Sequence, residues 1–225
     1  PVNRRQRQMC IRDSSLAVQQ KTNNWKAQLL EFLENRKNQS GIVYCLSQKL
    51  TEQCSEFLRF EGFNAYPFHA GLDTEVKIDT QDKFMTENNV VVCATIAFGM
   101  GIDKADVRYI AHISLPSSME AFYQEIGRAG RDGSEADTLL IFGLQDLFQR
   151  KRFIDMSDAH DSFKIKEHKR LDALIAYCES ATCRRQTLLS YFKETCETCG
   201  KCDNCLNPPD SYTHLRAHET TCDLV

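Results

Sequence analysis

A chain of 225 residues has room for one large domain or two small ones, with ample length for a buried core. Hydrophobic content of 42% and charged content of 26% are ordinary for a globular protein, and no apolar run is long enough to cross a bilayer. With no secretory signal either, we expect a protein of the bacterial cytoplasm or the eukaryotic nucleus that has no membrane partner. The net charge of −3 excludes nucleic-acid binding through overall charge, so any such contact needs local basic clusters.

The two ends of the sequence lack usable hydrophobic periodicity. RRQRQMCIRDS near the start and SYTHLRAHET near the end resemble translated sequencing-adapter read-through joined to an unrelated protein. The alternative is a pair of disordered native tails, with a basic N-terminal arm that touches DNA. On either interpretation we expect residues 1–23 and 210–225 to be non-native or disordered tails, and we assign them no function.

Between residues 24 and 150, amphipathic helices alternate with short apolar strands. The first helix has an apolar stripe from Trp25 to Leu33, and the pattern then predicts strands over 41–45, 63–68, 90–94, 107–113 and 136–142 and helices over 49–60, 74–85 and 117–126. Such alternation with short connections predicts an α/β lobe whose parallel sheet is covered on both faces. Ligands of these sheets bind at the carboxyl ends of the strands, and we expect the unusual residues there.

From residue 145 onward the strands give way to helices. We therefore predict a lobe over residues 24–150 and a small helical domain over residues 151–209, where Pro208 and Pro209 close the ordered part. Basic residues gather in and beside the second domain, at 150–152, 164–170 and 184–185. They are DNA contacts or, equally, solvated helix faces.

Nine of the eleven cysteines fall into two groups, and the other two lie in the terminal stretches. Cys45, Cys54 and Cys93 lie in predicted strands and a helix, where cysteine is usually a small buried apolar residue, and Cys178 is expected in a helix core. Five others crowd the stretch from 183 to 205. Without a secretory context, clustered cysteines favour a metal over disulfides.

Three cysteines of the second group, Cys199, Cys202 and Cys205, are spaced three residues apart. They can wrap one tetrahedral ion at about 2.3 Å if a distant fourth thiolate closes the shell. Four sulfur ligands leave no open position, which indicates a structural zinc site. The fourth ligand is Cys183, at the start of a predicted helix whose dipole favours a thiolate, or else Cys196.

The run QEIGRAGRDG at 124–133 begins where a predicted helix ends and holds two arginines three residues apart. Its glycines let the backbone approach another surface closely. The guanidinium forks of Arg128 and Arg131 match the oxygens of a transferring γ-phosphoryl group. Two exposed arginines capping a helix C-terminus are the alternative.

This run resembles motif VI of superfamily 2 helicases, in the form found in the RecQ family of DNA helicases. The resemblance implies that Arg128 and Arg131 reach, as arginine fingers, ATP bound by a neighbouring lobe, and that Gln124 couples the nucleotide state to DNA. SGIVYCLS at 40–47 resembles motif IV, which implies a DNA-phosphate contact at Ser47. FHAGL at 68–72 resembles a further family block, in which His69 is structural or contacts DNA or the other lobe.

VCATIAFGMGID at 92–103 resembles motif V. The hydroxyl of Thr95 and the amides around Gly101 can grip a phosphate, while Asp103 is placed to meet ribose or the arginines. A tight strand-to-helix turn alone explains the glycines but leaves Thr95 and Asp103 unexplained. RecQ proteins also carry a four-cysteine zinc site whose pattern uses the cysteine before Arg-Arg-Gln, which favours Cys183 over Cys196.

The resemblance covers about residues 24–209 and implies a RecA-like lobe followed by a helical four-cysteine zinc-binding domain. The resemblance further implies that the chain is part of an ATP-dependent 3′–5′ DNA helicase that acts on single-stranded DNA and duplex junctions in recombination and repair. The sequence has no GxxxxGKS/T loop and no DExH-type strand end. We therefore expect ATP and Mg²⁺ to bind only with a separate first lobe, and this chain alone to be inactive as an ATPase. The alternatives are a non-catalytic zinc-stabilised DNA-binding or adaptor module and a lobe of an RNA helicase.

Overall fold

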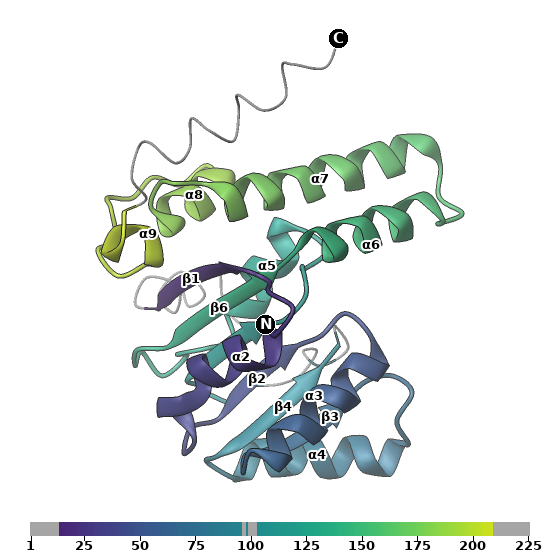
Figure 1. The fold of residues 1–225 in the computed structure, drawn as a ribbon, viewed down its shortest axis with the longest axis vertical. Helices are drawn as coiled ribbons and strands as arrows, with labels where there is room; N and C mark the ends of the chain where they lie inside the picture. Colours follow the sequence, from purple (N-terminus) through teal and green to yellow (C-terminus); the bar gives the residue numbers. More distant parts are fainter. Residues whose placement is uncertain (1–13, 96–97, 99–102, 209–225) are drawn as a thin grey trace.

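The computed structural model describes residues 14–95, 98 and 103–208. Its centre is a sheet of six parallel strands in the order β1-β6-β5-β2-β4-β3 (Figure 1). The strands are β1 (Ser15–Gln20), β2 (Gly41–Tyr44), β3 (Asn64–Phe68), β4 (Val90–Ala94), β5 (Tyr109–His112) and β6 (Asp137–Phe142). The predicted parallel α/β lobe is confirmed.

Four helices connect the strands of the lobe: α2 (Trp25–Leu33), α3 (Gln48–Phe60), α4 (Thr74–Thr86) and α5 (Met119–Ile126). A short 3₁₀ turn, η1 (Glu34–Arg36), follows the first of them. Side-chain oxygens of Asn24, Ser47 and Ser118 accept from backbone N–H groups in the first turns of α2, α3 and α5. These caps satisfy donors that have no partner inside a helix, and they fix where each helix begins.

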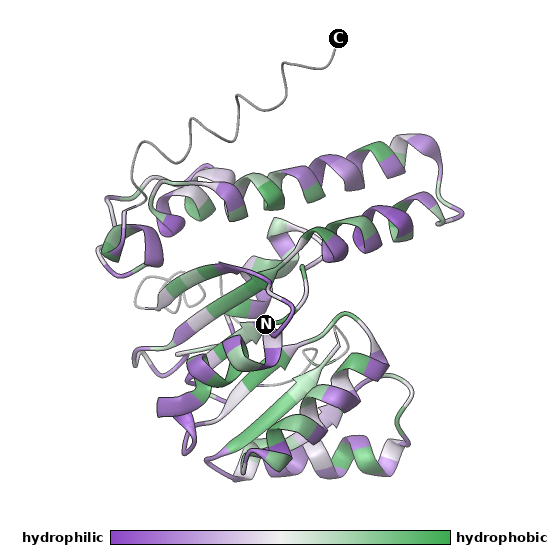
Figure 2. Cartoon of the chain, in the orientation of Figure 1, coloured by the Kyte–Doolittle hydropathy of each residue, from purple (hydrophilic) through white to green (hydrophobic). Residues whose placement is uncertain are grey.

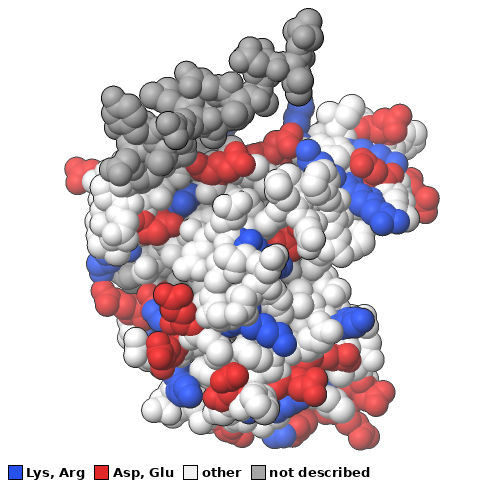
Figure 3. Space-filling view, viewed as in Figure 1, with Lys and Arg blue, Asp and Glu red and all other residues white. Residues whose placement is uncertain are grey.

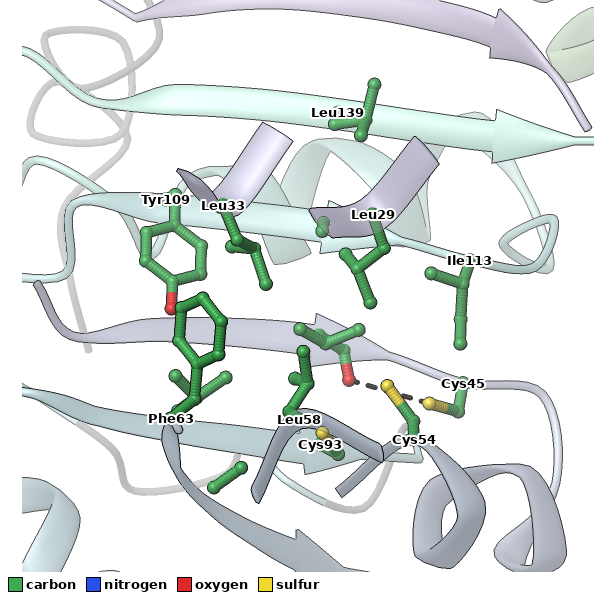
Figure 4. Close-up of a cluster of buried hydrophobic side chains, with 14 of the residues drawn as sticks. Leu29, Leu33, Cys45, Cys54, Leu58, Phe63, Cys93, Tyr109, Ile113 and Leu139 are labelled. Atoms are coloured by element: carbon green, nitrogen blue, oxygen red, sulfur yellow. Dashed lines mark hydrogen bonds between the residues drawn. The ribbon is translucent and has the colours of Figure 1, made fainter. Parts of the chain in front are cut away.

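One face of the sheet is covered by α2 and α3. Leu29, Leu33 and Leu58 from these helices pack on residues that alternate along the strands, such as Val43 and Val91 (Figure 4). The predicted burial of three cysteines is confirmed here, since Cys45, Cys54 and Cys93 are at most 5% exposed. Figure 2 shows the consequence for the sequence: the strands are mostly apolar, while the helices alternate between apolar and polar residues.

The opposite face carries two apolar clusters. Phe84 of α4 packs on Ile42 and Val92, in the half of the sheet formed by β2, β4 and β3. At the other half, Phe122 of α5 and Leu16 of β1 share a core with the helical domain. The lobe and the helical domain are therefore joined by continuous apolar packing.

The helical domain consists of α6 (Leu144–Asp155), α7 (Asp161–Glu179), α8 (Arg184–Tyr191) and α9 (Asp203–Leu206). Helices α6 and α7 form a hairpin that extends beyond the sheet (Figure 1). The boundary predicted after residue 150 falls inside α6, because that helix begins at 144 and runs without a break through the basic residues. Among the described helices, none is both long enough and apolar enough to span a membrane.

The prediction that residues 1–23 form a tail was wrong for its last ten residues. Ser15–Gln20 is strand β1, and it pairs in parallel with β6 from Ser15 opposite Asp137 to Gln20 opposite Phe142. Leu16 is 1% exposed in the shared core, so the strand is held by packing as well as by hydrogen bonds. The rest of both predicted tails lies outside the described residues.

Candidate functional site

Three of the predicted site residues follow neighbouring strands at the carboxyl edge of the sheet. Ser47 comes after β2, His69 after β3 and Thr95 after β4. The backbone N–H of Thr95 donates to the carbonyl oxygen of Phe68 over 3.1 Å, which ties the loops after β3 and β4 together. The expectation that these residues share one edge therefore agrees with the fold, whereas Gly101 lies outside the described residues.

Ser47 and His69 differ in what they can offer a ligand. Ser47 is exposed, and its hydroxyl oxygen accepts from Leu50 N over 3.2 Å, so its proton is directed to another acceptor. His69 is only 3% exposed, and its Nε2 lies 3.3 Å from Oε1 of Glu52. The buried ring favours a structural role for His69 over a direct contact with DNA.

The arginine loop, residues 128–133, departs from the expected location. Gly130 N donates to Val107 O over 2.9 Å, and Asp132 N donates to Ala105 O over 3.3 Å, so the loop backbone lies beside the segment that enters β5. The reason is topological: α5 returns the chain from the carboxyl edge of β5 to the amino edge of β6. The expectation that this motif also lies at the carboxyl edge was wrong for its backbone.

Gly130 fits the loop for two physical reasons. Its φ of +65° lies in the left-handed region, and a Cβ atom there would meet Ser134 O at 2.8 Å. The neighbouring Asp132 is fixed by a short ion pair with Arg108 and by the N–H of Ser134. Burial alone would raise the pKa of Asp132, but the N–H of Ser134 and the Arg108 guanidinium together lower it.

The two arginines of the loop have different surroundings. Arg131 Nη1 lies 2.6 Å from Oδ1 of Asp103, and the Arg131 side chain is 14% exposed while that of Asp103 is 78% exposed. The predicted pairing of the motif V aspartate with a motif VI arginine is thus present in the structure. Arg128 is half-buried, and its guanidinium interacts electrostatically with the hydroxyl of Tyr44, the last residue of β2. Gln124 is exposed on the last turn of α5.

A buried polar cluster beside Arg128 was not predicted from the sequence. His112 of β5 and Glu125 of α5 are 1% and 7% exposed, and Nε2 of His112 lies 2.7 Å from Oε2 of Glu125. The Tyr44 ring stacks on the His112 ring, with centroids 5.0 Å apart and planes 21° from parallel. The available signal was a charged residue, Glu125, on the apolar face of a short helix.

The four predicted zinc ligands come together in the helical domain. The sulfur atoms of Cys183, Cys199, Cys202 and Cys205 all lie within 4.8 Å of one another, and two of the separations are 3.9 and 4.0 Å. Tetrahedral Zn–S bonds of about 2.3 Å place sulfur atoms about 3.8 Å apart, so this donor set fits one zinc ion. Cys196 is not part of the cluster, and its carbonyl accepts from Gln186 Nε2 instead.

Backbone amides surround the cluster. Cys199 N donates to Cys183 Sγ over 3.3 Å, and Arg184 N donates to Cys202 Sγ over 3.4 Å. Burial would raise the pKa of Cys183, but the N–H groups of Gln186 and Cys199 lower it to about 7. Burial raises the pKa of Cys202. The amides therefore stabilise negative charge at Cys183, the residue that caps α8 as predicted.

The suggested DNA contact at Arg184 and Arg185 was wrong, because both side chains are buried, at 6% and 8% exposure. Arg184 Nη1 donates to the carbonyl oxygens of Tyr177 and Cys178, and its Nε lies 2.9 Å from Oδ1 of Asp203. Arg185 Nη2 donates to Ser14 O over 2.7 Å. These guanidinium groups tie the zinc module together and do not face solvent.

Residues beside the zinc ligands also hold strand β1. Val18 N donates to Oδ2 of Asp203 over 2.9 Å, and Ser15 Oγ donates to Lys201 O over 3.3 Å. Together with the Arg185–Ser14 bond, these contacts fix the start and the middle of the strand on the side away from β6. We call this set of contacts the β1 clasp.

The surface in Figure 3 carries both signs of charge, with acidic and basic side chains interspersed over the lobe and the helical hairpin. In the hairpin, Arg150 Nε donates to Leu115 O, and Arg170 pairs with Glu167 at 2.6 Å. Two arginines of the suggested basic clusters are thus occupied by protein partners. Lys164 Nζ likewise donates to Asp155 O, so Lys151, Arg152, Lys166 and Lys169 remain as the candidates for contacts with phosphate.

Comparisons with known proteins agree with this division of the chain. Residues 25–133 match the helicase conserved C-terminal domain, and residues 144–206 match the RecQ zinc-binding domain. The ATP-dependent DNA helicase RecQ of Haemophilus influenzae is 43% identical over 189 residues, which cover 84% of this chain and 30% of that protein. ATP-dependent helicase SGS1 of Saccharomyces cerevisiae is 38% identical over 196 residues, covering 84% and 14%. The chain thus spans less than a third of the length of either relative.

Solved structures show the same fold for the lobe. A DEAD box protein from Methanococcus jannaschii aligns with a TM-score of 0.52 at 24% identity, covering 63% of this chain and 39% of that one. Domain 2 of the Mss116p DEAD-box helicase also aligns with a TM-score of 0.52, at 15% identity, covering 79% and 87%. From its two domain matches, its four-cysteine cluster and its relatives, the chain belongs to the RecQ family of helicases and comprises a RecA-like C-terminal lobe and a RecQ zinc-binding module.

Proposed function

We propose that the chain works as part of an ATP-dependent 3′–5′ DNA helicase, in which Arg128 and Arg131 face a nucleotide held by a separate P-loop lobe. The Arg131–Asp103 pair carries this proposal, because it brings the motif V and motif VI segments within 2.6 Å of each other. The side chain of this aspartate is 78% exposed, whereas that of Arg131 is 14% exposed. A guanidinium placed beside the motif V segment can stabilise the charge that develops on phosphate oxygens.

The test is hydrolysis of ATP by the full-length helicase that contains this lobe. Arg131→Ala is expected to lower DNA-stimulated kcat by about 10³-fold, because one fixed positive charge is lost from the transition state. Lys83→Ala is the matched control, since Lys83 pairs with Asp79 and lies over the Tyr66 ring on the surface of the lobe. If the kcat of Arg131→Ala equals that of Lys83→Ala, the arginine-finger role is contradicted. A non-catalytic, zinc-stabilised adaptor module would then describe the chain better.

Nucleotide and Mg²⁺ binding belong, in this proposal, to the P-loop lobe. The chain on its own is therefore expected to show no ATPase activity above background, with or without DNA. Mixing it with a separately purified P-loop lobe should restore a measurable rate. ATP hydrolysis by the isolated chain would contradict the proposal that the P-loop lobe binds the nucleotide and Mg²⁺.

For DNA, we propose a path over the carboxyl edge of the sheet, where Ser47 and Thr95 offer hydroxyl groups to the phosphate backbone. Binding of single-stranded DNA by the chain should be weak and should fall steeply with salt. Ser47→Ala is expected to weaken it severalfold without a change in salt slope, since the hydroxyl is uncharged. Glu56→Gln on α3, an exposed position of the lobe, serves as the control.

The zinc module completes the proposal as a structural unit. Cys183, Cys199, Cys202 and Cys205 would hold one Zn²⁺, which closes the loops between α8 and α9 in place of a large apolar core. Metal analysis of the purified chain should give one zinc per molecule. Cys196→Ser should leave that ratio unchanged, whereas Cys202→Ser should abolish it.

A further inference from the structure

The buried pair of His112 and Glu125 joins β5 to α5 at one point. Both side chains are almost fully buried, and the 2.7 Å contact between them satisfies groups that would otherwise be costly to desolvate. The ring of Phe122, also on α5, meets the His112 ring edge-on at 5.2 Å. Glu125 precedes Arg128 by only three residues, so this contact fixes the helix from which the arginine loop departs.

Tyr44 extends the buried pair toward the arginine loop. Its ring is 5% exposed and stacks on His112, while its hydroxyl donates to Phe98 O over 3.3 Å and interacts with the Arg128 guanidinium. Burial raises the pKa of Tyr44, so the phenol stays neutral at physiological pH. A neutral hydroxyl donates one hydrogen bond and still accepts another, as these two partners require.

Through its hydroxyl, Tyr44 links the end of its own strand, β2, to two segments that are distant in sequence. These are the loop after β4, at Phe98, and the loop after α5, at Arg128. Arginine has a long side chain with many rotamers, and holding it in one of them costs conformational entropy. An acceptor fixed by ring stacking supplies the restraint before any ligand binds. Arg128 is thereby directed from a loop at the amino edge of the sheet toward Tyr44, at the carboxyl end of β2.

The helical domain reaches the same cluster through α6. Arg150, whose Nε donates to Leu115 O over 2.8 Å, lines one small cavity together with Tyr44, His112 and Glu125. Burial lowers the pKa of Arg150, and the carboxylates of Glu125 and Asp146 oppose that effect. The helical domain thus adds a positive charge near Glu125.

We propose that Tyr44 is a positioning residue for Arg128, with its ring held by the His112–Glu125 pair and its hydroxyl orienting the guanidinium for ATP hydrolysis. This inference rests on the proposed role of Arg128 in that reaction. Tyr44 itself does not touch the nucleotide. Loss of its hydroxyl should therefore lower turnover while leaving nucleotide affinity nearly unchanged.

The test compares Tyr44→Phe with the parent in the full-length helicase. The substitution removes one oxygen and keeps the stacked ring, so folding and zinc content should not change. We expect kcat to fall about ten- to a hundredfold, as for a catalytic group misplaced by about 1 Å, with KM for ATP within twofold. Tyr191→Phe is the matched control, because its hydroxyl bonds to Glu120 Oε1 at 2.8 Å on the surface of the module.

A double-mutant cycle separates this inference from the proposed function. In an Arg128→Ala background, Tyr44→Phe should have no further effect on kcat, because its only route to the reaction is gone. If Arg128→Ala itself leaves kcat unchanged, the proposed function fails. If Arg128→Ala lowers kcat but Tyr44→Phe does not, or if the two losses simply add, the positioning role of Tyr44 is overturned and the arginine finger stands.

Discussion

The lobe and the zinc module are stabilised by different means. The lobe has a sheet with apolar side chains on both faces, and many of them, such as Leu58 and Val43, are fully buried. The buried leucines of the helical domain, such as Leu174 and Leu188, belong to a core that it shares with the lobe, while Phe148 and Met156 of its hairpin are more than two-thirds exposed. We therefore expect the loops around the four cysteines to depend on the metal, whereas the lobe does not.

Removal of zinc gives the largest expected difference between the two regions. Zinc sites of this kind contribute roughly 10 kcal/mol or more, so a strong chelator should unfold residues 183–206. Hydrogen exchange should show lost protection in α8 and α9, while the amides of β2, β4 and β5 stay protected. Equal loss of protection in both regions would show that the lobe depends on the metal too.

A core substitution in the lobe is expected to have the opposite effect, destabilising the lobe while the zinc site stays intact. Leu58→Ala on α3 removes a side chain that is 0% exposed and should destabilise the chain by about 2–5 kcal/mol in a denaturant titration. Its zinc content should stay at one per chain. Phe60→Ala, two residues along the same helix at 87% exposure, should change stability by less than about 0.5 kcal/mol. If Leu58→Ala loses zinc, the lobe and the zinc module unfold together as one cooperative unit.

The β1 clasp lies where the two regions meet, and Asp203 is its central residue. Asp203→Ala leaves Val18 N and part of the Arg184 guanidinium without their acceptor, so we expect a loss of about 1–3 kcal/mol. Exchange of the Val18 amide should rise more than exchange of the β2 amides. Asp172→Ala, at an exposed position of α7, should alter neither quantity.

The smallest expected effect concerns pH and stays within the lobe. The pKa of Asp132 is lowered in the folded state, so its pair with Arg108 stabilises the fold above the ordinary aspartate pKa and is lost as pH falls through the lowered value. An exposed pair contributes about 0.5 kcal/mol. Asp132→Asn should therefore lower unfolding free energy by that amount at pH 7 and by nothing at pH 2, without affecting zinc content.

Much of this architecture could be predicted from the sequence, because strands and helices each have a characteristic spacing of apolar residues. The four zinc ligands were also predictable, since the spacing of Cys199, Cys202 and Cys205 is determined by the coordination geometry. Strand β1 was missed because its apolar alternation covers only Leu16 and Val18, next to a stretch without periodicity. The burial of Arg184 and Arg185 was missed because their acceptors, Asp203 and Ser14, are distant in sequence.

The polar cluster behind Arg128 shows a further limit of prediction from the sequence. The motif residues that resemble known helicases were identifiable individually, but the contact between Tyr44 and Arg128 depends on how β2 and α5 approach each other in three dimensions. The location of the arginine loop at the amino edge of β5 follows from connectivity, and a strict count of strands and helices would have given it. Sequence motifs thus identify the residues of the site, whereas the connectivity of strands and helices determines where in the fold those residues lie.

The β1 clasp has a consequence for the behaviour of the molecule in solution. In the described sheet β1 is an edge strand, and its outward N–H at Val18 is occupied by Asp203 of the zinc module. An uncovered edge strand is a template on which a strand from another molecule can add. We therefore expect loss of a bound ion to uncover this edge and to promote association between molecules.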